Sequence, residues 1–458
     1  MLNIGVMKTI YTCCPEFLHP VLNRVKKSEI GYRLAKGVFW STAGAVISRG
    51  LMLAASILVA RILGKTGYGE LGIIQSTVGM FGVFAGFGLG LTATKHVAEF
   101  RKTDPGKAGR IIGLSGLFAM VTGGLMAAGL AICAPWLAEH TLNAPHLAGV
   151  LRIGAFILFI SALNGAQTGA LSGFEAFRTI AYVNLFVGLI SFPILVGGAY
   201  WGGITGAVWA LALNLCFNWL LNHLALRKEA QRYQIPFTFR ECRRELSVFW
   251  MFSLPSVISG SMVGPVLWVC KSMLANQHNG YSELGVYAAA EHWRTFVFFA
   301  TGIIAQAAFP VLSQLYGHGQ RQLFKKTLLT QFYLNAAIAL FGAVIIIILS
   351  KPIMNTYGPE FSGSTLVLII VMLGCIPMEL TSIVGVVNKC IGNIWWGVLL
   401  NVLWAIAILL ASSTLVKHGA LGLAWAFFIA YGFHLAFTTI YVFWVFRTSP
   451  KLRMERTL

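Results

Sequence analysis

Long apolar runs separated by short polar links form the dominant pattern of the chain. Residues 37–94 show this pattern: one apolar run leads into the polar turn RILGKTGYGELG (61–72), and a second apolar run follows. A helix of about 20 apolar residues crosses the roughly 30 Å hydrocarbon core of a bilayer. Both runs reach that length, so residues 37–94 predict a hairpin of two membrane-spanning helices.

Runs of this kind recur along the whole chain and predict an all-α polytopic membrane protein with 12 transmembrane helices. The predicted spans lie at about 37–60, 71–94, 111–134, 149–172, 179–201, 203–226, 248–276, 285–316, 328–350, 364–388, 394–416 and 419–446. The longest link between them, 227–247, leaves six spans on either side. We therefore expect an N-lobe at 37–226 and a C-lobe at 248–446, flanked by basic tails at 1–36 and 447–458.

The two halves resemble each other. GYGELGII (67–74) recurs as GYSELGVY (280–287), and GITGAVWALAL (203–213) recurs as GALGLAWAFFI (419–429) at nearly the same offset. Each half contains an even number of spans, so both halves start on the same side of the membrane. This indicates two pseudo-symmetric six-helix lobes. We interpret the GYGELG turn itself as structural.

Charge follows the links rather than the spans. Only 11% of residues are charged, against about 25% in soluble proteins, and the net charge is +19. Lysine and arginine gather in the links 95–110, 227–247 and 317–327 and in both tails. By the positive-inside rule both termini are expected in the cytoplasm. The positive net charge therefore reflects membrane topology and does not indicate binding to nucleic acid. The lack of an Asn-x-Ser/Thr sequon favours a bacterial source, and hence the inner membrane.

The sequence predicts neither a metal site nor a cofactor. Its eight cysteines show no metal-ligand spacing. Gly64-Lys65-Thr66 imitates the end of a phosphate-binding loop, but Val59 occupies the place of the first glycine.

Ionisable groups inside the spans are the candidate functional residues. Arg49 lies in the middle of span one, where an unpartnered arginine costs about 2.5–3.5 kcal/mol. It is either a substrate-facing cation or a structural partner of neighbouring helices. Lys271 lies near the outer end of span seven, where snorkelling to the membrane surface would explain it equally well. Glu291 and Arg294 are three residues apart on one helix face, so they can neutralise each other.

Glu379, in the middle of span ten, is the best candidate for a proton- or sodium-linked carboxylate, with Glu291 as a second. The alternative for Glu379 is a hydrogen-bonded, protonated core group. Amide side chains inside the spans either line a polar cavity or join helix to helix: Gln75, Asn164, Gln167 and Asn184. Glycines at fourfold spacing, including Gly82, Gly86 and Gly90 and then Gly165, Gly169 and Gly173, predict tight helix contacts. The first half has no acid deep in a span, so a cavity there would favour an anion.

Residues 36–100 and LSGFEAFR (171–178) resemble the polysaccharide-exporting oligosaccharide flippase family, which shares a superfamily with the multidrug and toxin extruders. This resemblance implies two six-helix lobes in a V around a central cavity. It implies alternating access that moves undecaprenyl-diphosphate-linked glycans from the cytoplasmic to the periplasmic leaflet. Relatives carry cavity arginines on helices one and eight, where this chain has Arg49 and Arg294. The 12 spans, rather than the 14 of lipid II flippases, argue against lipid II as substrate.

We therefore expect a transporter for lipid-linked oligosaccharide in surface polysaccharide biosynthesis, with membrane lipids and a polymerase or other assembly proteins as partners. Arg49, Arg294 and Lys271 would form its anion site. The first alternative is a cation-coupled multidrug exporter. The second is a membrane-embedded glycan polymerase or ligase, which the short outer links disfavour.

Overall fold

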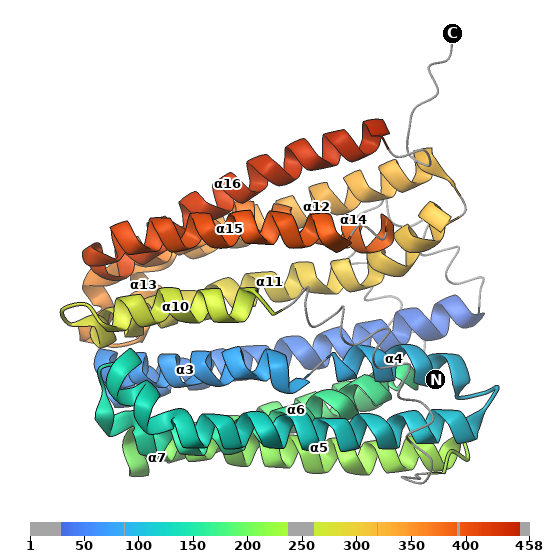
Figure 1. The fold of residues 1–458 in the computed structure, drawn as a ribbon, viewed down its shortest axis with the longest axis horizontal. Coiled ribbons are helices and arrows are strands. Elements are labelled where there is room, and N and C mark those ends of the chain that lie inside the picture. The colour runs from blue at the N-terminus through green and yellow to red at the C-terminus, as the bar shows by residue number, and fades with distance from the viewer. Residues whose placement is uncertain (1–28, 87, 237–260, 318, 392–393, 449–458) are drawn as a thin grey trace.

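A computed structural model describes residues 29–86, 88–236, 261–317, 319–391 and 394–448, and every regular element in these ranges is a helix (Figure 1). The predicted N-terminal tail up to residue 28 lies outside the described residues. So do residues 237–260, which include most of the predicted link and the beginning of span seven, and the C-terminal tail from residue 449.

The helices form two groups that lie on opposite sides of the molecule in Figure 1. The N-terminal group consists of α3 (Glu29–Gly86), α4 (Leu89–Phe100), α5 (Pro105–Trp136), α6 (Ala148–Gly173) and α7 (Phe177–Arg232). The C-terminal group consists of α10 (Val263–Ala275), α11 (Gly280–Gly317), α12 (Arg321–Ile348), α13 (Ser350–Thr356), α14 (Thr365–Ile391), α15 (Ile394–Leu415) and α16 (Gly419–Thr448). The two groups follow the same division of the chain as the sequence repeat.

Two of the long helices are hairpins. Helix α3 reverses at Gly64, whose φ of 69° and ψ of 179° are not helical, and α7 reverses at Gly203, with φ 55° and ψ −138°. After the first reversal the Ser56 hydroxyl hydrogen-bonds the Tyr68 hydroxyl at 2.5 Å, although a straight helix would separate these residues by about 18 Å. Glycine suits both corners because it adopts positive φ without steric cost.

The predicted second span is not continuous. The second arm of α3 ends at Gly86, and α4 starts at Leu89 after Gly88, which has φ 63°. Hydropathy did not predict this break, because GFGLG (86–90) contains no polar residue and continues the apolar run.

Small residues bring α4 and α6 together, as the glycine spacing predicted. A Cβ on Gly169 would overlap the backbone of Gly90, and one on Gly173 would lie 2.7 Å from the Cβ of Val97. Thr94 donates its hydroxyl proton to the Gly169 carbonyl oxygen at 2.9 Å across this contact. The backbones therefore approach closely enough for a side-chain hydroxyl to join them.

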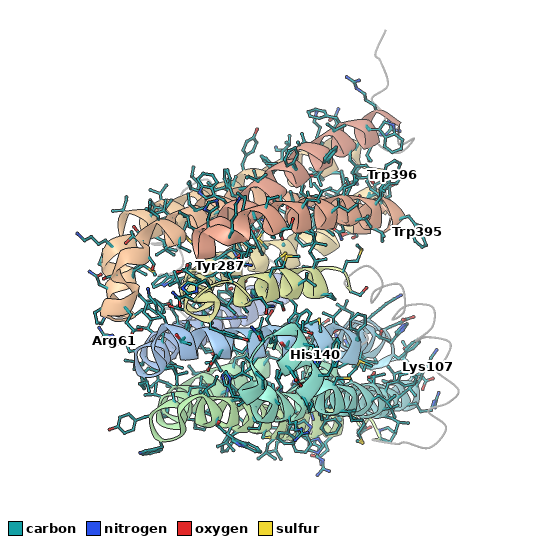
Figure 2. The ribbon with its side chains drawn as sticks, turned by 60° about the vertical axis from the view of Figure 1, so that its left-hand side comes forward. Arg61, Lys107, His140, Tyr287, Trp395 and Trp396 are labelled. Atoms are coloured by element: carbon teal, nitrogen blue, oxygen red, sulfur yellow. The ribbon has the colours of Figure 1, made fainter. Side chains whose placement is uncertain are left out.

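Seven segments of the described residues are long and apolar enough to cross a membrane. Three of them have 41, 56 and 51 residues, at Val46–Gly86, Phe177–Arg232 and Trp395–Val445, whereas one crossing takes about 20. Large apolar side chains cover the outside of the bundle; Trp395 and Trp396 lie on the outer surface of the C-terminal group (Figure 2). This exterior is that of a multi-pass membrane protein.

Arg101 fixes the end of the N-terminal group that is remote from the Gly64 corner. Its side chain, only 9% exposed, donates to the Gly173 carbonyl oxygen at 3.0 Å and pairs with Glu175 at 2.7 Å. The guanidinium also lies over the Tyr233 ring, 5.8 Å from its centroid. One buried side chain thus joins α4, the α6–α7 turn and the end of α7.

We expect Arg101→Ala to lower the free energy of unfolding by about 2 kcal/mol, because it removes charge-assisted hydrogen bonds from a buried site. Thermal melting of the purified protein in detergent measures this loss. Lys102→Ala, at the exposed neighbouring position, is the control and should melt as the wild type does. Equal melting temperatures for all three proteins would show that Arg101 does not hold this end together.

Candidate functional site

A cavity of about 290 Å³ lies between the two helix groups. Its wall is built from both arms of α3 and from α7 on one side, and from α10 and α11 on the other. The polar or ionisable side chains in this wall are Ser56, Tyr68, Gln75, Ser76, Lys271, Tyr287, Glu291, His292 and Thr295.

Helical periodicity explains which side chains reach the cavity. Met52, Ser56 and Val59 follow one face of α3, whereas Ala288, Glu291 and Thr295 follow one face of α11. The sequence supplies polar or charged residues on these two faces although most of both helices is apolar. The cavity wall is therefore mixed, with polar and ionisable groups set among apolar side chains between two membrane-type helices.

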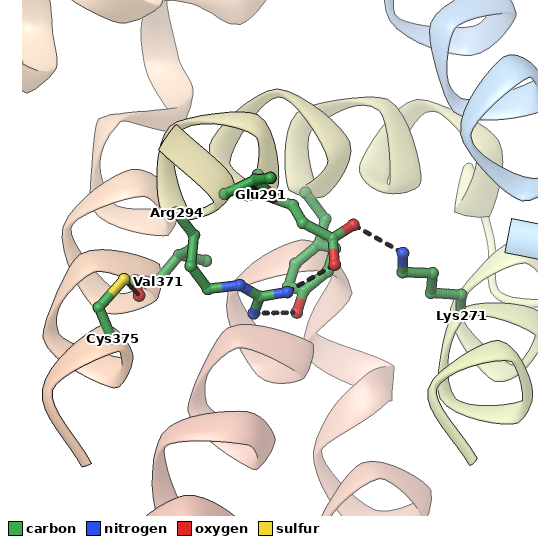
Figure 3. A network of polar contacts seen from close by, with 7 residues as sticks. Lys271, Glu291, Arg294, Val371 and Cys375 are labelled. Carbon is green, nitrogen blue, oxygen red and sulfur yellow. Dashed lines mark hydrogen bonds and ion pairs between the residues drawn. The ribbon is translucent and has the colours of Figure 1, made fainter. Parts of the chain in front are cut away.

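Three charged side chains are linked to one another beside the cavity (Figure 3). Lys271 of α10 donates to Oε2 of Glu291 at 2.6 Å, and Nη2 of Arg294 donates to Oε1 of the same carboxylate at 2.5 Å. Both carboxylate oxygens are thus used. The cluster carries two formal positive charges and one negative charge, so it remains positive overall.

The two cations are not equally accessible. Lys271 and Glu291 line the cavity, whereas Arg294 is absent from its wall and its side chain is only 8% exposed. Arg294 donates to the Tyr287 hydroxyl at 3.4 Å and lies over the Phe427 ring, 5.6 Å from its centroid. Arg294 is therefore connected to the cavity through Glu291 and Tyr287, and Lys271 is the cation of the cluster that lines the cavity.

Arg49 lies just beyond the cavity. It precedes Met52 by three residues on α3, so it continues the face that forms the wall. The side chain is exposed, and its guanidinium lies over the Phe299 ring of α11, 5.4 Å from the centroid. The two helix groups thus bring Arg49 to their interface, one helical turn from the wall.

The wall also contains aromatic residues that the sequence reasoning missed. Tyr68 belongs to the GYGELG turn that we interpreted as structural, yet it lines the cavity. Its ring centroid lies 6.1 Å from that of His292 and 6.4 Å from that of Tyr357, both in the C-terminal group. The available signal was the tyrosine repeated at the same place in both turns, Tyr68 and Tyr281.

Glu379 lies away from the cavity, inside the C-terminal group. It is 5% exposed, and its Oε1 accepts a hydrogen bond of 3.4 Å from the Asn335 side chain of α12. Asn335 is fully buried, and its own Oδ1 has no hydrogen-bond partner. Among the described residues, no salt bridge to Glu379 is formed.

The four predicted amides separate into two sets. Gln75 lines the cavity. Asn164 donates to the Leu215 carbonyl oxygen at 3.1 Å, and the Gln167 amide pairs with the backbone carbonyl and indole nitrogen of Trp219 at 3.1 Å each. Asn164 and Gln167 therefore join α6 to α7, and Asn184, on α7, is also absent from the cavity wall. Among the described residues, no group of three or more His, Cys, Asp or Glu side chains could hold a metal ion.

The fold is that of a known class of transporters. The structure superposes on the inward-facing conformation of a multidrug resistance MATE family transporter of the MOP superfamily with a TM-score of 0.70. This likeness covers 90% of this chain and 99% of the transporter at 15% identity, so it concerns the fold alone.

Residues 34–316 match the polysaccharide biosynthesis protein family, and the chain therefore belongs to this family. The resemblance carried by residues 36–100 and 171–178 is thereby confirmed. The EPS I polysaccharide export inner membrane protein EpsE of Ralstonia nicotianae is 26% identical over 62% of this chain. The lipid III flippase of Escherichia coli is 23% identical over 62% of this chain. The matched region spans 65% of the length of the first relative and 68% of the second.

We expect Glu291→Gln to destabilise the protein by about 3 kcal/mol, because it leaves the buried Arg294 without a counter-ion. Lys271→Met should cost less, since Glu291 keeps Arg294. The double variant Glu291→Gln/Arg294→Met should recover part of the loss. Thermal melting in detergent compares the three proteins, and equal effects of the two single substitutions would contradict the unequal roles of the two cations.

Proposed function

We propose that this protein is a flippase that moves undecaprenyl-diphosphate-linked oligosaccharide from the cytoplasmic to the periplasmic leaflet of a bacterial inner membrane, for surface polysaccharide biosynthesis. The observation that carries the proposal is the net-positive cluster at the wall of a cavity between two helix groups. The family match and the names of the two relatives support a polysaccharide-linked cargo.

The diphosphate is the part of such a substrate that this site fits. Lys271 would contact it directly, and Arg49 would meet it at the interface beside the cavity. A diphosphate that binds Lys271 would compete with the Glu291 carboxylate for the same ammonium group. Arg294 would then contribute by remaining the ion-pair partner of Glu291. Tyr68, Gln75 and His292 offer the hydrogen-bonding groups that a neighbouring sugar requires.

The size of the cavity supports alternating access. At about 290 Å³ it is at the lower end of small-molecule sites, which have about 300–1,000 Å³. It holds a diphosphate and little more, so a complete oligosaccharide requires the two groups to separate. We propose that the groups are two six-helix lobes of a 12-span protein with both termini in the cytoplasm. The lobes would comprise 37–226 and 248–446, and the lipid tail would stay in the bilayer.

Glu379 is our candidate for coupling to an ion gradient, with Glu291 as a second. A carboxylate this well buried in a membrane protein requires a proton or a cation to offset its desolvation. Its position between α12 and α14, away from the cavity, would let an ion and the substrate bind at separate places.

A cation-coupled drug exporter is the second candidate function, and the buried Glu379 together with the MATE-type fold favours it. The positive cluster disfavours it, because most drugs exported by cation coupling are themselves cationic and would be repelled by Lys271. Efflux of ethidium that depends on Glu379, without any loss of surface polysaccharide, would reverse this preference.

Lys271→Met and Arg49→Ala should each weaken the binding of inorganic pyrophosphate to the purified protein by about tenfold, the loss of one charge-assisted hydrogen bond. Isothermal titration calorimetry measures the affinity. Lys417→Met, which removes an exposed lysine that is not part of the cavity wall, is the control and should bind as the wild type does. Export of surface polysaccharide in cells should fall with the affinity. Unchanged pyrophosphate binding and normal export at normal protein levels would refute the anion site.

Glu379→Gln should abolish the response of transport to an imposed proton or sodium gradient while leaving pyrophosphate binding within about twofold of the wild type. Proteoliposomes with a fluorescent undecaprenyl-diphosphate sugar and each gradient in turn provide the measurement. Glu99→Gln, at an exposed carboxylate outside the spans, is the control. A Glu379→Gln variant that still responds to both gradients would exclude Glu379 as the coupling group.

A further inference from the structure

The two helix groups are joined at one end of the molecule, which we call the closed end: the end that contains Lys65, Leu142, Asn276 and Glu360. Three hydrogen bonds connect the groups there. The Asn276 amide donates to the Thr141 carbonyl oxygen at 2.7 Å. The Tyr281 hydroxyl donates to the Leu142 carbonyl oxygen, also at 2.7 Å. The third bond runs from the backbone N–H of Lys65 to the Glu360 carboxylate at 3.0 Å.

The Lys65–Glu360 bond is a helix cap supplied by the opposite group. The second arm of α3 begins after Gly64, and the first N–H groups of a helix have no partner within it. A side chain just before the helix usually accepts from them, but glycine has none. Glu360 fills this role from the C-terminal group, and its negative charge is also favoured by the positive end of the helix dipole.

The local sequence around Glu360 presents its carboxylate at this place. Gly358 has φ 120°, a value that side chains other than hydrogen rarely allow, and Pro359 starts the helical turn Pro359–Ser364. Phe361 is buried beside it, and the Lys65 ammonium lies over the Phe361 ring, 6.0 Å from its centroid. The glutamate itself is exposed, so water can hydrate it when the groups separate.

A second glutamate cap of this kind lies entirely within the C-terminal group. At the start of α16, Gly419 has φ 67°, and the Glu283 carboxylate accepts from the Ala420 N–H at 2.8 Å. Glu283 and Ala420 both belong to the C-terminal group. Two glutamates thus cap two helices that start at a left-handed glycine, one within a group and one between the groups.

We propose that Glu360 is a positioning residue of the transport cycle, a latch that holds the closed end shut by capping the second arm of α3. The bond exists only while the groups meet at this end, so its free energy contributes to the preference for the closed arrangement. The glycine contact nearby is consistent with a separable seam: a Cβ on Gly69 would overlap Tyr281, and one on Gly285 would overlap Lys65. The inference rests on the proposed function only in assuming that the two ends open in turn.

Distances between spin labels test the latch in the full chain. The eight native cysteines are first replaced by alanine. Cysteines at the exposed Glu139 and Lys351 then report on the closed end, and cysteines at the exposed Lys102 and Lys325 report on the opposite end. Electron double resonance in lipid nanodiscs gives the population of each arrangement.

Glu360→Ala should shift the ratio of closed to open arrangements at the labelled closed end by about fivefold towards open, the typical value of a helix cap. The opposite end should close in parallel. Glu360→Gln, which keeps an acceptor oxygen but loses the charge, should give a smaller shift. Glu283→Ala should lower the melting temperature without changing either distance distribution, because its cap lies within one group.

Unchanged distances in both Glu360 variants would refute the latch, as would a Glu283→Ala shift of the same size. The result is independent of the substrate. Pyrophosphate binding can fail while the Glu360 shift remains, which would reject the anion site and keep the latch. Normal pyrophosphate binding and normal export, with no change of the distances in the Glu360 variants, would keep the anion site and reject the latch.

Discussion

A carboxylate held between two cations is the interaction on which the rest of this site depends. Glu291 accepts from Lys271 on one side and from Arg294 on the other, so it joins α10 to α11. Inside a helical membrane protein neither cation could remain uncompensated without a large desolvation cost. Because one carboxylate serves both, the cluster keeps a net positive charge at the cavity while its buried arginine is satisfied. The same arrangement stabilises the buried arginine and, in the function that we propose, favours an anion in the cavity.

The seam between the helix groups is built on a different principle from the interior of each group. Within the N-terminal group, α4 and α6 meet through glycines and through the Thr94–Gly169 bond, and Arg101 joins three segments. Between the groups, the closed end combines glycine backbones, two exposed hydrogen bonds and one part-buried one with an apolar cluster that contains residues of both groups. The Lys65–Glu360 and Asn276–Thr141 hydrogen bonds are exposed and can be exchanged for bonds to water. In the transport cycle that we propose, the two groups separate along this seam.

Hydropathy and spacing predicted the helical membrane architecture, the hairpin at residues 37–94, the glycine contact between α4 and α6 and the Glu291–Arg294 pair. They could not predict the break between Gly86 and Leu89, because the break leaves the hydrophobic pattern intact. Lys271 was ambiguous since its partner lies on another helix, and only the placement of α10 beside α11 reveals it. Tyr68 and Glu360 were missed for a related reason. Their contacts cross between groups, and a single sequence contains no record of which turns meet.

The cavity and the closed end are physically connected through Tyr68. This residue lines the cavity and hydrogen-bonds Ser56, and its ring also contacts Phe361, with 6.5 Å between centroids, beside the Glu360 cap. A ligand that displaces Tyr68 would therefore disturb Phe361, whose ring lies under the Lys65 ammonium. Because energetic coupling between two sites is reciprocal, a ligand that shifts the latch we propose would bind with a correspondingly shifted affinity once the closed end opens. The glycine–tyrosine turn at 67–72 is thus a corner of the fold that contacts both the cavity and the seam.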